Sequence, residues 1–296
     1  MNTDIFKYDG QRKLSLGRLS TDSRNFDVVK NEALKMTAEY QEKIEIMQEK
    51  LYAEAKEGLI IIFQAMDAAG KDSTIKHVMS GINPQGVDVT SFKQPSHEEL
   101  AHDFLWRIEQ HIPRRGHIAI MNRSYYEDVL VVKVHDLQKG YKMPRRCIDM
   151  PASDFFHKRY KHIKNYEEYL NDNGYRLLKF FLNISFFKQK ERFLQRIDTP
   201  DKNWKFSEAD LKERKFWNEY QDAYESAVNH TATVSAPWYV VPADQKWFTR
   251  YIVSKIIFEE LSRIDPQYPE ISEAERQKLP EYRKELLRQS GGSLSS

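Results

Sequence analysis

Residues 58–74 read GLIIIFQAMDAAGKDST, an apolar run followed by small residues and a lysine. This pattern predicts a strand buried on both faces, then a phosphate-binding loop (P-loop) that opens a helix. Two letters depart from the usual loop, because Ala65 stands at the first glycine and Asp72 stands where a hydroxyl side chain would bind the metal. A small-residue turn with a solvated lysine is the alternative, but the strand before it and the helix after it favour a P-loop.

The acidic residues of this loop suggest a metal ion. Asp67 lies within the loop and Asp72 lies at the start of the helix, so both carboxylates would repel a bound phosphate without a cation between them. Mg²⁺ prefers such oxygen ligands, and Mn²⁺ could replace it. Asp72 could instead only complement the helix dipole. Lys71 can reach the outer phosphates, and the remaining loop residues expected to bind phosphate are Ala68, Ala69, Gly70, Ser73 and Thr74.

The composition is that of a globular protein. Of its 296 residues 40% are hydrophobic, which is enough for a sizeable core. The 46 basic and 44 acidic side chains nearly cancel, so a polyanion would have to bind a local basic cluster. The single cysteine, Cys147, excludes an intrachain disulfide, and no apolar stretch approaches the about 20 residues that span a bilayer. We expect a cytoplasmic protein with no membrane or nucleic-acid partner.

Apolar and amphipathic segments alternate along the chain. Strands are expected at residues 58–64, 87–92, 117–122 and 176–184, with a weaker candidate at 236–244, and helices at 31–56, 71–80, 96–112 and 154–173. This alternation predicts an α/β fold with a parallel sheet covered by helices on both faces. The functional residues should then lie beyond the carboxyl ends of the strands.

The chain should divide into three parts. Residues 1–56 are expected to form an N-terminal arm, loosely packed to about residue 28, and an amphipathic helix. Residues 57–264 should form the P-loop domain, with a lid at about 150–215. Residues 265–296 read as a polar tail that frays from about Gln289.

A second polar motif follows the strand expected at residues 117–122. The strand ends in Asn122, where a phosphoryl-transfer enzyme would carry a second metal-binding carboxylate. Glu127 or Asp128 could supply that acid instead, although Glu127 could simply cap the following helix. Arg123 is well placed to bind a phosphate with two hydrogen bonds, the alternative being a surface ion pair.

Basic runs make up the third feature. They occupy residues 157–164, 188–196 and 198–206, and Arg214 follows. Such a run is most often a solvated helix face. These runs flank the strand expected at 176–184, however, so they could form a basic lid over a reacting phosphate. Their spread suits a long anion better than a single triphosphate.

Three separated motifs closely resemble the polyphosphate kinase 2 family. They are QAMDAAGKDSTIKHVMSGINPQGVDVTSFKQPS (64–96), FLWRIEQHIPRRGHIAIMNRSYYEDVL (104–130), and NWKFSEADLKERKFWNEYQDAYE (203–225) with APWYVVPADQKWFTR (236–250). The resemblance implies a thymidylate-kinase-like P-loop kinase fold of three layers with a helical lid. It also implies Mg²⁺ dependence, transfer of phosphoryl groups between inorganic polyphosphate and a nucleotide, and a homodimer or homotetramer.

Carried over by position, the resemblance implies catalytic roles for Asp67, Lys71, Arg123 and Asp128, with Asp67 and Asp128 holding the metal. Asn122 occupies a position where some members have Asp. Tyr126, Glu127 and Asp128 look most like the subgroup that phosphorylates both nucleoside monophosphates and diphosphates. The implied lid cations are Lys158, Arg159, Lys190, Arg192, Lys202, Lys205 and Arg214.

We therefore expect Mg²⁺-dependent, reversible transfer of the terminal phosphoryl group of polyphosphate to AMP, ADP, GMP or GDP, with ATP among the products. One alternative is a nucleoside monophosphate kinase that uses ATP as donor. Another is a non-catalytic P-loop protein that binds a polyanion, against which the near-neutral net charge counts.

Overall fold

The computed structural model describes residues 1–289. A six-stranded sheet forms the centre of the molecule, in the order β1-β6-β5-β2-β4-β3. The strands are β1 (Lys7–Tyr8), β2 (Gly58–Ala65), β3 (Val87–Ser91), β4 (Ile118–Asn122), β5 (Tyr175–Asn183) and β6 (Trp238–Pro242). All pairs are parallel except β1 with β6. The predicted parallel sheet is confirmed.

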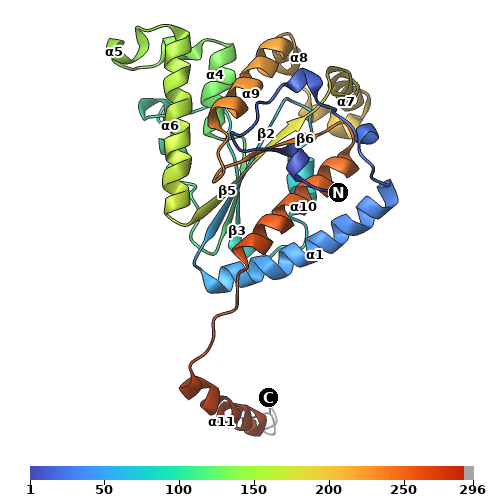
Figure 1. The fold of residues 1–296 in the computed structure, drawn as a ribbon, viewed down its shortest axis with the longest axis vertical. Coiled ribbons are helices and arrows are strands. Elements are labelled where there is room, and N and C mark those ends of the chain that lie inside the picture. Colours follow the sequence, from blue (N-terminus) through green and yellow to red (C-terminus); the bar gives the residue numbers. More distant parts are fainter. Residues whose placement is uncertain (290–296) are drawn as a thin grey trace.

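The α-helices are α1 (Lys30–Glu54), α2 (Lys71–Val78), α3 (Trp106–Glu109), α4 (Val131–Val134), α5 (Arg145–Ile148), α6 (Ala152–Asp172), α7 (Phe186–Asp198), α8 (Glu208–Arg214), α9 (Trp217–Thr231), α10 (Lys246–Ile264) and α11 (Glu273–Gln289). Helices α1 and α10 run side by side, and α10 also packs on α2 and β6 (Figure 1). Helix α6 packs on β5 and α9. The sheet and these helix layers confirm the expected three-layer α/β fold.

Strand β2 lies in the middle of the sheet because every one of its residues can be buried. All eight are buried, and β4 and β5 flank the strand on its two sides. The Ile-rich run at residues 59–62 suits a pleated surface covered on both faces. The P-loop therefore emerges from the best-protected strand, with the ends of β4 on one side and β5 on the other.

The N-terminal segment packs more closely than expected. Phe6, Tyr8, Leu14 and Leu16 are buried, and β1 adds an antiparallel edge to β6. The rings of Phe6, Phe26 and Phe248 form one aromatic group, in which the centroids of Phe6 and Phe248 each lie 5.2 Å from that of Phe26. These few apolar residues hold an otherwise polar segment against the body.

The prediction of a single helix at residues 96–112 is wrong. The predicted capping box forms, because the backbone N–H of Ser96 donates to the Glu99 carboxylate at 2.6 Å and Ser96 Oγ accepts from Glu99 N at 3.2 Å. It closes only the turn at residues 96–99, which leads into the 3₁₀ helix η5 (Glu99–Ala101). The side chain of Asp103 then accepts a hydrogen bond from Leu105 N at 2.9 Å and starts a new turn, which leads into the short α3.

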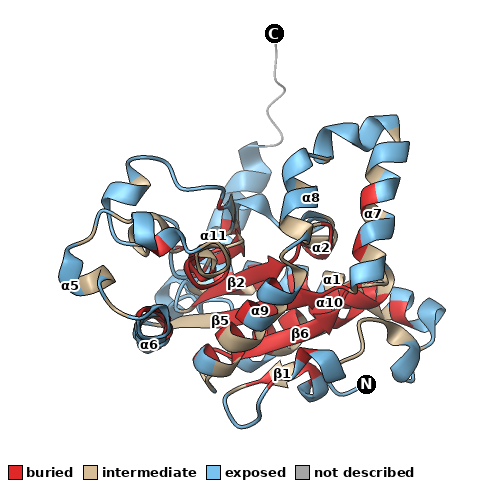
Figure 2. Ribbon diagram, turned by 90° about the horizontal axis from the view of Figure 1, so that it is seen from above, coloured by how far each residue is buried: buried red, intermediate tan, exposed pale blue. Residues whose placement is uncertain are grey.

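The lid expected at about residues 150–215 is also too wide. Helix α6 and strand β5 fall within that range, yet they carry core residues such as Phe156, Ile163 and Phe180. What remains is a largely exposed arch of α7, the 3₁₀ helix η8 (Pro200–Lys205) and α8, hereafter the arch (residues 186–214) (Figure 2).

The C-terminal segment beyond α10 is exposed. Helix α11 stands away from the body at the end of an extended connection (Figure 1), and none of its residues is buried. The fraying expected from about Gln289 lies outside the described residues. Within residues 1–289 no helix combines the length and apolarity that a membrane crossing requires.

Candidate active site

The P-loop makes a tight turn between β2 and α2. Ala65 closes the strand with ordinary backbone geometry, whereas Ala68 and Gly70 have positive φ values of 61° and 102°. A Cβ at Gly70 would lie 3.3 Å from Ser73 Oγ and 3.5 Å from the Arg192 guanidinium, so glycine is needed there for both space and conformation. Ser73 Oγ donates to the Gly70 carbonyl at 3.0 Å. The small residues predicted for the loop therefore serve its geometry.

Lys71 lies over the loop that it follows. Its Nζ donates to the Ala65 carbonyl at 2.9 Å. Burial and the neighbouring Arg123 lower the pKa of Lys71, while Asp67, Glu127 and Asp72 act in the opposite direction. Lys71 thus stands among three carboxylates, at the place where a phosphate chain on the loop would meet it.

An unusual backbone conformation directs Arg123 toward the P-loop, where Lys71 also lies. The residue has φ 65°, and its N–H donates to the Phe63 carbonyl at 3.0 Å, which ties it to the end of β2. Its guanidinium lies 3.2 Å from Asp67, with 40% of the side chain exposed. The Glu127 carboxylate, more than Asp67, raises the pKa of Arg123. The predicted residues Asp67, Lys71, Arg123 and Glu127 therefore do come together.

Of the two acids that follow β4, Glu127 is better placed than Asp128 to act beside the P-loop. Burial raises the pKa of Glu127, although the positive charges of Arg123 and Lys71 lower it. The buried amide of Gln64, oriented to satisfy both neighbours, donates to Glu127 at 2.9 Å and accepts from Ser124 Oγ at 3.2 Å. Ser124 in turn accepts from Tyr126 N and caps the 3₁₀ helix η6 (Tyr125–Val129). The Glu127 carboxylate therefore lies beside two cations, Arg123 and Lys71, close to the P-loop.

Asp72 and Asn122 form a polar pair next to the loop. The amide Nδ2 of Asn122 donates to Asp72 Oδ1 at 2.7 Å and lies 3.4 Å from Ser91 Oγ. A standard P-loop has a hydroxyl residue at the first position and an acid at the end of the neighbouring strand. Here the acid, Asp72, follows the loop, and the neutral residue, Asn122, ends the neighbouring strand. The pair therefore carries the same single negative charge as in a standard P-loop, but on the other partner.

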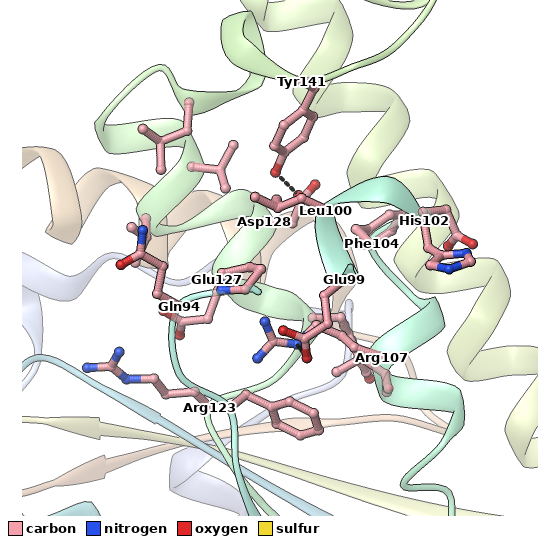
Figure 3. A pocket seen from close by; sticks show the side chains of 18 of the residues that line it. Gln94, Glu99, Leu100, His102, Phe104, Arg107, Arg123, Glu127, Asp128 and Tyr141 are labelled. Atoms are coloured by element: carbon pink, nitrogen blue, oxygen red, sulfur yellow. Dashed lines mark hydrogen bonds and ion pairs between the residues drawn. The ribbon is translucent and has the colours of Figure 1, made fainter. Parts of the chain in front are cut away.

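Asp128 has other partners than expected. Its carboxylate accepts a short hydrogen bond from Tyr141 and lies 2.7 Å from the Arg159 guanidinium (Figure 3). Arg159 also stacks on Phe104 and Phe155, with its Cζ 4.3 and 4.9 Å from the ring centroids. Arg159 is therefore a buried wall residue and not a lid cation. Asp128 joins η6 to α6 and to the Tyr141 loop, and it lines the same cavity as Arg123 and Glu127.

A cavity of about 830 Å³ opens beside Arg123 and Glu127, along the segments that follow β3 and β4. Figure 3 shows Arg123 at the end of it away from Tyr141, with Glu127 between the two. Gln94, Leu100 and Phe104 also line it. Apolar side chains such as Phe92, Val131 and Val132 complete the lining. Sequence reasoning missed the wall at residues 92–107, whose only signal was its position after a strand end. The cavity therefore combines an apolar wall with five basic and five acidic side chains, among them Arg123 and Glu127.

A second cavity of about 750 Å³ lies on the other side of the P-loop, after β5 and β6. Its cations are Lys30, Lys188, Arg192, Lys246 and Arg250, and its acids are Glu191, Asp198 and Asp244. The positive charges of Lys202 and Lys205 reach Lys246 and lower its pKa, after the effects of burial, Arg192 and Arg250. Sequence reasoning missed Lys246 and Arg250, although QKWFTR directly follows the last strand. The cations predominate in this cavity.

The predicted arch cations play different parts. Arg192 donates to the carbonyls of Ala68, Ala69, Ala243 and Asp244 at 2.7–3.1 Å, which clamps the P-loop to the turn after β6. Arg214 donates to Gln189 Oε1 at 2.5 Å and covers the Phe186 ring, and Gln189 donates to the Asp67 carbonyl at 2.9 Å. The side chains of Lys158, Lys190, Lys202 and Lys205 are exposed.

Residues 27–269 match the family model of Polyphosphate kinase 2. The chain belongs to the polyphosphate kinase 2 family. It is 45% identical over 289 residues to an ADP-polyphosphate phosphotransferase of Rhodopseudomonas palustris, covering 97% of this chain and 99% of that protein. It is also 45% identical over 249 residues to an AMP/ADP-polyphosphate phosphotransferase of Meiothermus ruber, covering 84% and 88%.

The structure agrees with this family assignment. A crystal structure of polyphosphate kinase 2 from Arthrobacter aurescens superposes with a TM-score of 0.84 at 36% identity, over 94% of this chain and 96% of that one. The expected P-loop kinase fold is thereby confirmed. The metal site expected at Asp67 and Asp128 stays a prediction, and within residues 1–289 no group of three or more His, Cys, Asp or Glu side chains is arranged to hold a metal ion.

Proposed function

We propose that this protein transfers the terminal phosphoryl group of inorganic polyphosphate to nucleotides, and that the transfer is reversible. One observation carries the proposal: each of two cavities of different chemistry has a lining arginine that contacts the P-loop, Arg123 through Asp67 and Arg192 through the carbonyls of Ala68 and Ala69. The cavity after β3 and β4 has an apolar wall that ends at Arg123, and the cavity after β5 and β6 is lined by cations. The first suits a nucleoside with its phosphates, and the second suits a long polyanion.

The nucleotide would enter the 830 Å³ cavity with its base against Leu100 and Phe104. Its phosphates would then point toward Arg123. Polyphosphate would lie along Lys188, Lys246 and Arg250, with the exposed Lys202 and Lys205 of the arch above it. Five lining cations against three acids leave this cavity positive even though the whole chain is nearly neutral.

The chemistry requires positioning and neutralisation of charge. The acceptor is already a phosphate oxyanion, so no strong base has to remove a proton. Lys71 and the loop amides would hold the donor phosphates, and Arg123 would stabilise the equatorial oxygens in the transition state. The ion pair between Arg123 and Asp67 at 3.2 Å would exchange one partner for a phosphate when substrate binds.

Mg²⁺ would relieve repulsion at this site, because the negative charges of Asp67, Glu127 and Asp72 all act on Lys71 and additional phosphate charge would repel them. Mg²⁺ usually takes one or two carboxylates together with phosphates and water. We propose Asp67 and Glu127 as its ligands in place of the expected pair with Asp128, since Arg159 and Tyr141 occupy the Asp128 carboxylate. When bound, the ion would neutralise charge between the two phosphate chains.

The acceptors proposed are AMP and ADP, and also GMP and GDP. Two relatives at 45% identity carry the names AMP/ADP- and ADP-polyphosphate phosphotransferase, and one from Pseudomonas aeruginosa at 30% identity is named for GDP. Acceptance of monophosphates is supported by Tyr126, Glu127 and Asp128, through which this chain resembles the subgroup that acts on both kinds of acceptor. We further propose a cytoplasmic homodimer or homotetramer, which light scattering would test for assembly.

An assay of AMP, ADP, GMP and GDP with polyphosphate, with and without Mg²⁺, tests the function. We expect products with one more phosphate, formed only when polyphosphate and Mg²⁺ are both present. ADP formed from AMP and ATP without polyphosphate would instead favour an ordinary monophosphate kinase. Tight, salt-dependent polyphosphate binding without any product would favour a polyanion-binding protein.

A further inference from the structure

A buried ion pair contacts the segment that follows β4. Glu167 on α6 and Lys179 on β5 are 1% and 0% exposed, and Lys179 Nζ lies 2.6 Å from Glu167 Oε2. Lys179 also donates to the Thr231 carbonyl and to the Tyr126 hydroxyl, both at 3.1 Å. The ammonium group therefore has three acceptors and is fully satisfied. Neither charge faces either cavity.

The same pair holds two consecutive tyrosines of the active-site segment. Glu167 Oε1 accepts from Tyr125 at 2.8 Å and from Tyr126 at 2.7 Å. The Tyr126 hydroxyl also lies 2.9 Å from Thr231 Oγ1. Both tyrosines are buried, and in the chain they stand between Arg123 and Glu127. One carboxylate oxygen thus fixes the segment that presents the phosphate-facing arginine and the acid opposite it.

Stability alone gives a weak reason for this arrangement. Moving two charges out of water costs several kcal/mol per ion, and well-packed apolar residues often serve as well or better. A buried network that is fully satisfied does, however, hold one geometry. Such restraint is needed here, because Arg123 has a left-handed backbone, and strained residues persist only where their surroundings fix them.

We infer that Glu167, whose buried charge Lys179 balances, is a positioning residue for phosphoryl transfer, which acts through the hydroxyls of Tyr125 and Tyr126 to fix Arg123 and Glu127 at the P-loop. The inference rests on the proposed function. It assigns to the two tyrosines of the RSYYED motif a role that needs their hydroxyl groups and not only their rings.

The test uses Tyr125→Phe and Tyr126→Phe, which keep the packed ring and remove the hydroxyl. The matched control is Tyr239→Phe, a buried tyrosine on β6 whose hydroxyl interacts with Arg263 instead. For each protein we would measure Tm, then kcat and KM for ADP and for polyphosphate well below the lowest Tm. We expect kcat to fall about tenfold in the two test variants, with both KM values within about twofold of wild type. The control should keep its kcat.

A second pair of variants separates positioning from loss of fold. Glu167→Gln with Lys179→Met removes both charges but keeps an acceptor for the tyrosines, whereas Glu167→Ala with Lys179→Met removes the acceptor as well. We expect the first to retain kcat within about threefold and the second to lose about tenfold. An unchanged kcat in the tyrosine variants, or an equal loss in Tyr239→Phe, would overturn the inference. Wild-type protein that makes no product from polyphosphate would refute the proposed function itself.

Discussion

Replacing Asp128 by asparagine tests whether Asp128 is a metal ligand or a structural residue of the cavity wall. Asp128 and Arg159 are 7% and 10% exposed, and 2.7 Å separates their charged groups. Asp128→Asn keeps the shape but leaves the guanidinium buried without its counter-charge. Removing one partner of a buried ion pair costs about 3–5 kcal/mol. Because Arg159 retains its contacts with Phe104 and Phe155, we expect the lower end, which lowers Tm by roughly 6–12 °C.

The assay combines a thermal melt with a titration of Mg²⁺ against activity. Asp128→Asn should lower Tm while the Mg²⁺ concentration for half-maximal activity stays within about twofold of wild type. Asp67→Asn should do the reverse, with a raised Mg²⁺ requirement and a nearly unchanged Tm. Tyr141→Phe, which removes one hydrogen bond from Asp128, should cost only about 1 kcal/mol. A wild-type Tm together with a raised Mg²⁺ requirement in Asp128→Asn would refute the reasoning.

Three further predictions concern the P-loop and the segment at the end of β4. Lys71→Ala should lower turnover by about a hundredfold or more with a Tm near that of wild type, and near-full activity would contradict the role given to this lysine. Asn122→Asp places a second carboxylate beside Asp72, so we expect a lower Tm without Mg²⁺ that added Mg²⁺ restores; no response to the ion would count against a metal here. Because burial raises the pKa of Glu127 above 4.5, the folded protein binds more protons than the unfolded one just above that pH. This contribution to stability falls as pH rises, so Tm measured from pH 4 to 7 should show a smaller fall with pH in Glu127→Gln.

The parts of the fold that local sequence determines were predictable. The run at residues 58–74 combines an apolar strand, small residues and a lysine, and each of these acts on its immediate neighbours in the chain. The parallel sheet also followed from the alternation of segments. By contrast, β1 depends on pairing with β6, more than two hundred residues away in sequence, and nothing local in residues 7–8 indicates that partner.

The site residues were predictable only where the sequence motif offers a single candidate for each role. Glu127 and Asp128 are adjacent in sequence, and the 3₁₀ helix η6 turns them toward different partners, one to Arg123 and the other to Arg159. The choice between them therefore required coordinates. Lys30 and Arg250 are similar cases, because each is an ordinary basic residue until α1 and α10 bring it to the second cavity.

The placement of the P-loop between two cavities also bears on the order of events in catalysis. The two cavities share no lining residue, and each lies along a different pair of strands. With the substrates bound as proposed, a nucleotide product would leave the first cavity while the shortened polymer remains in the second. Successive turnovers would draw the same chain forward by one phosphate at a time, so that a single polyphosphate molecule serves many acceptors.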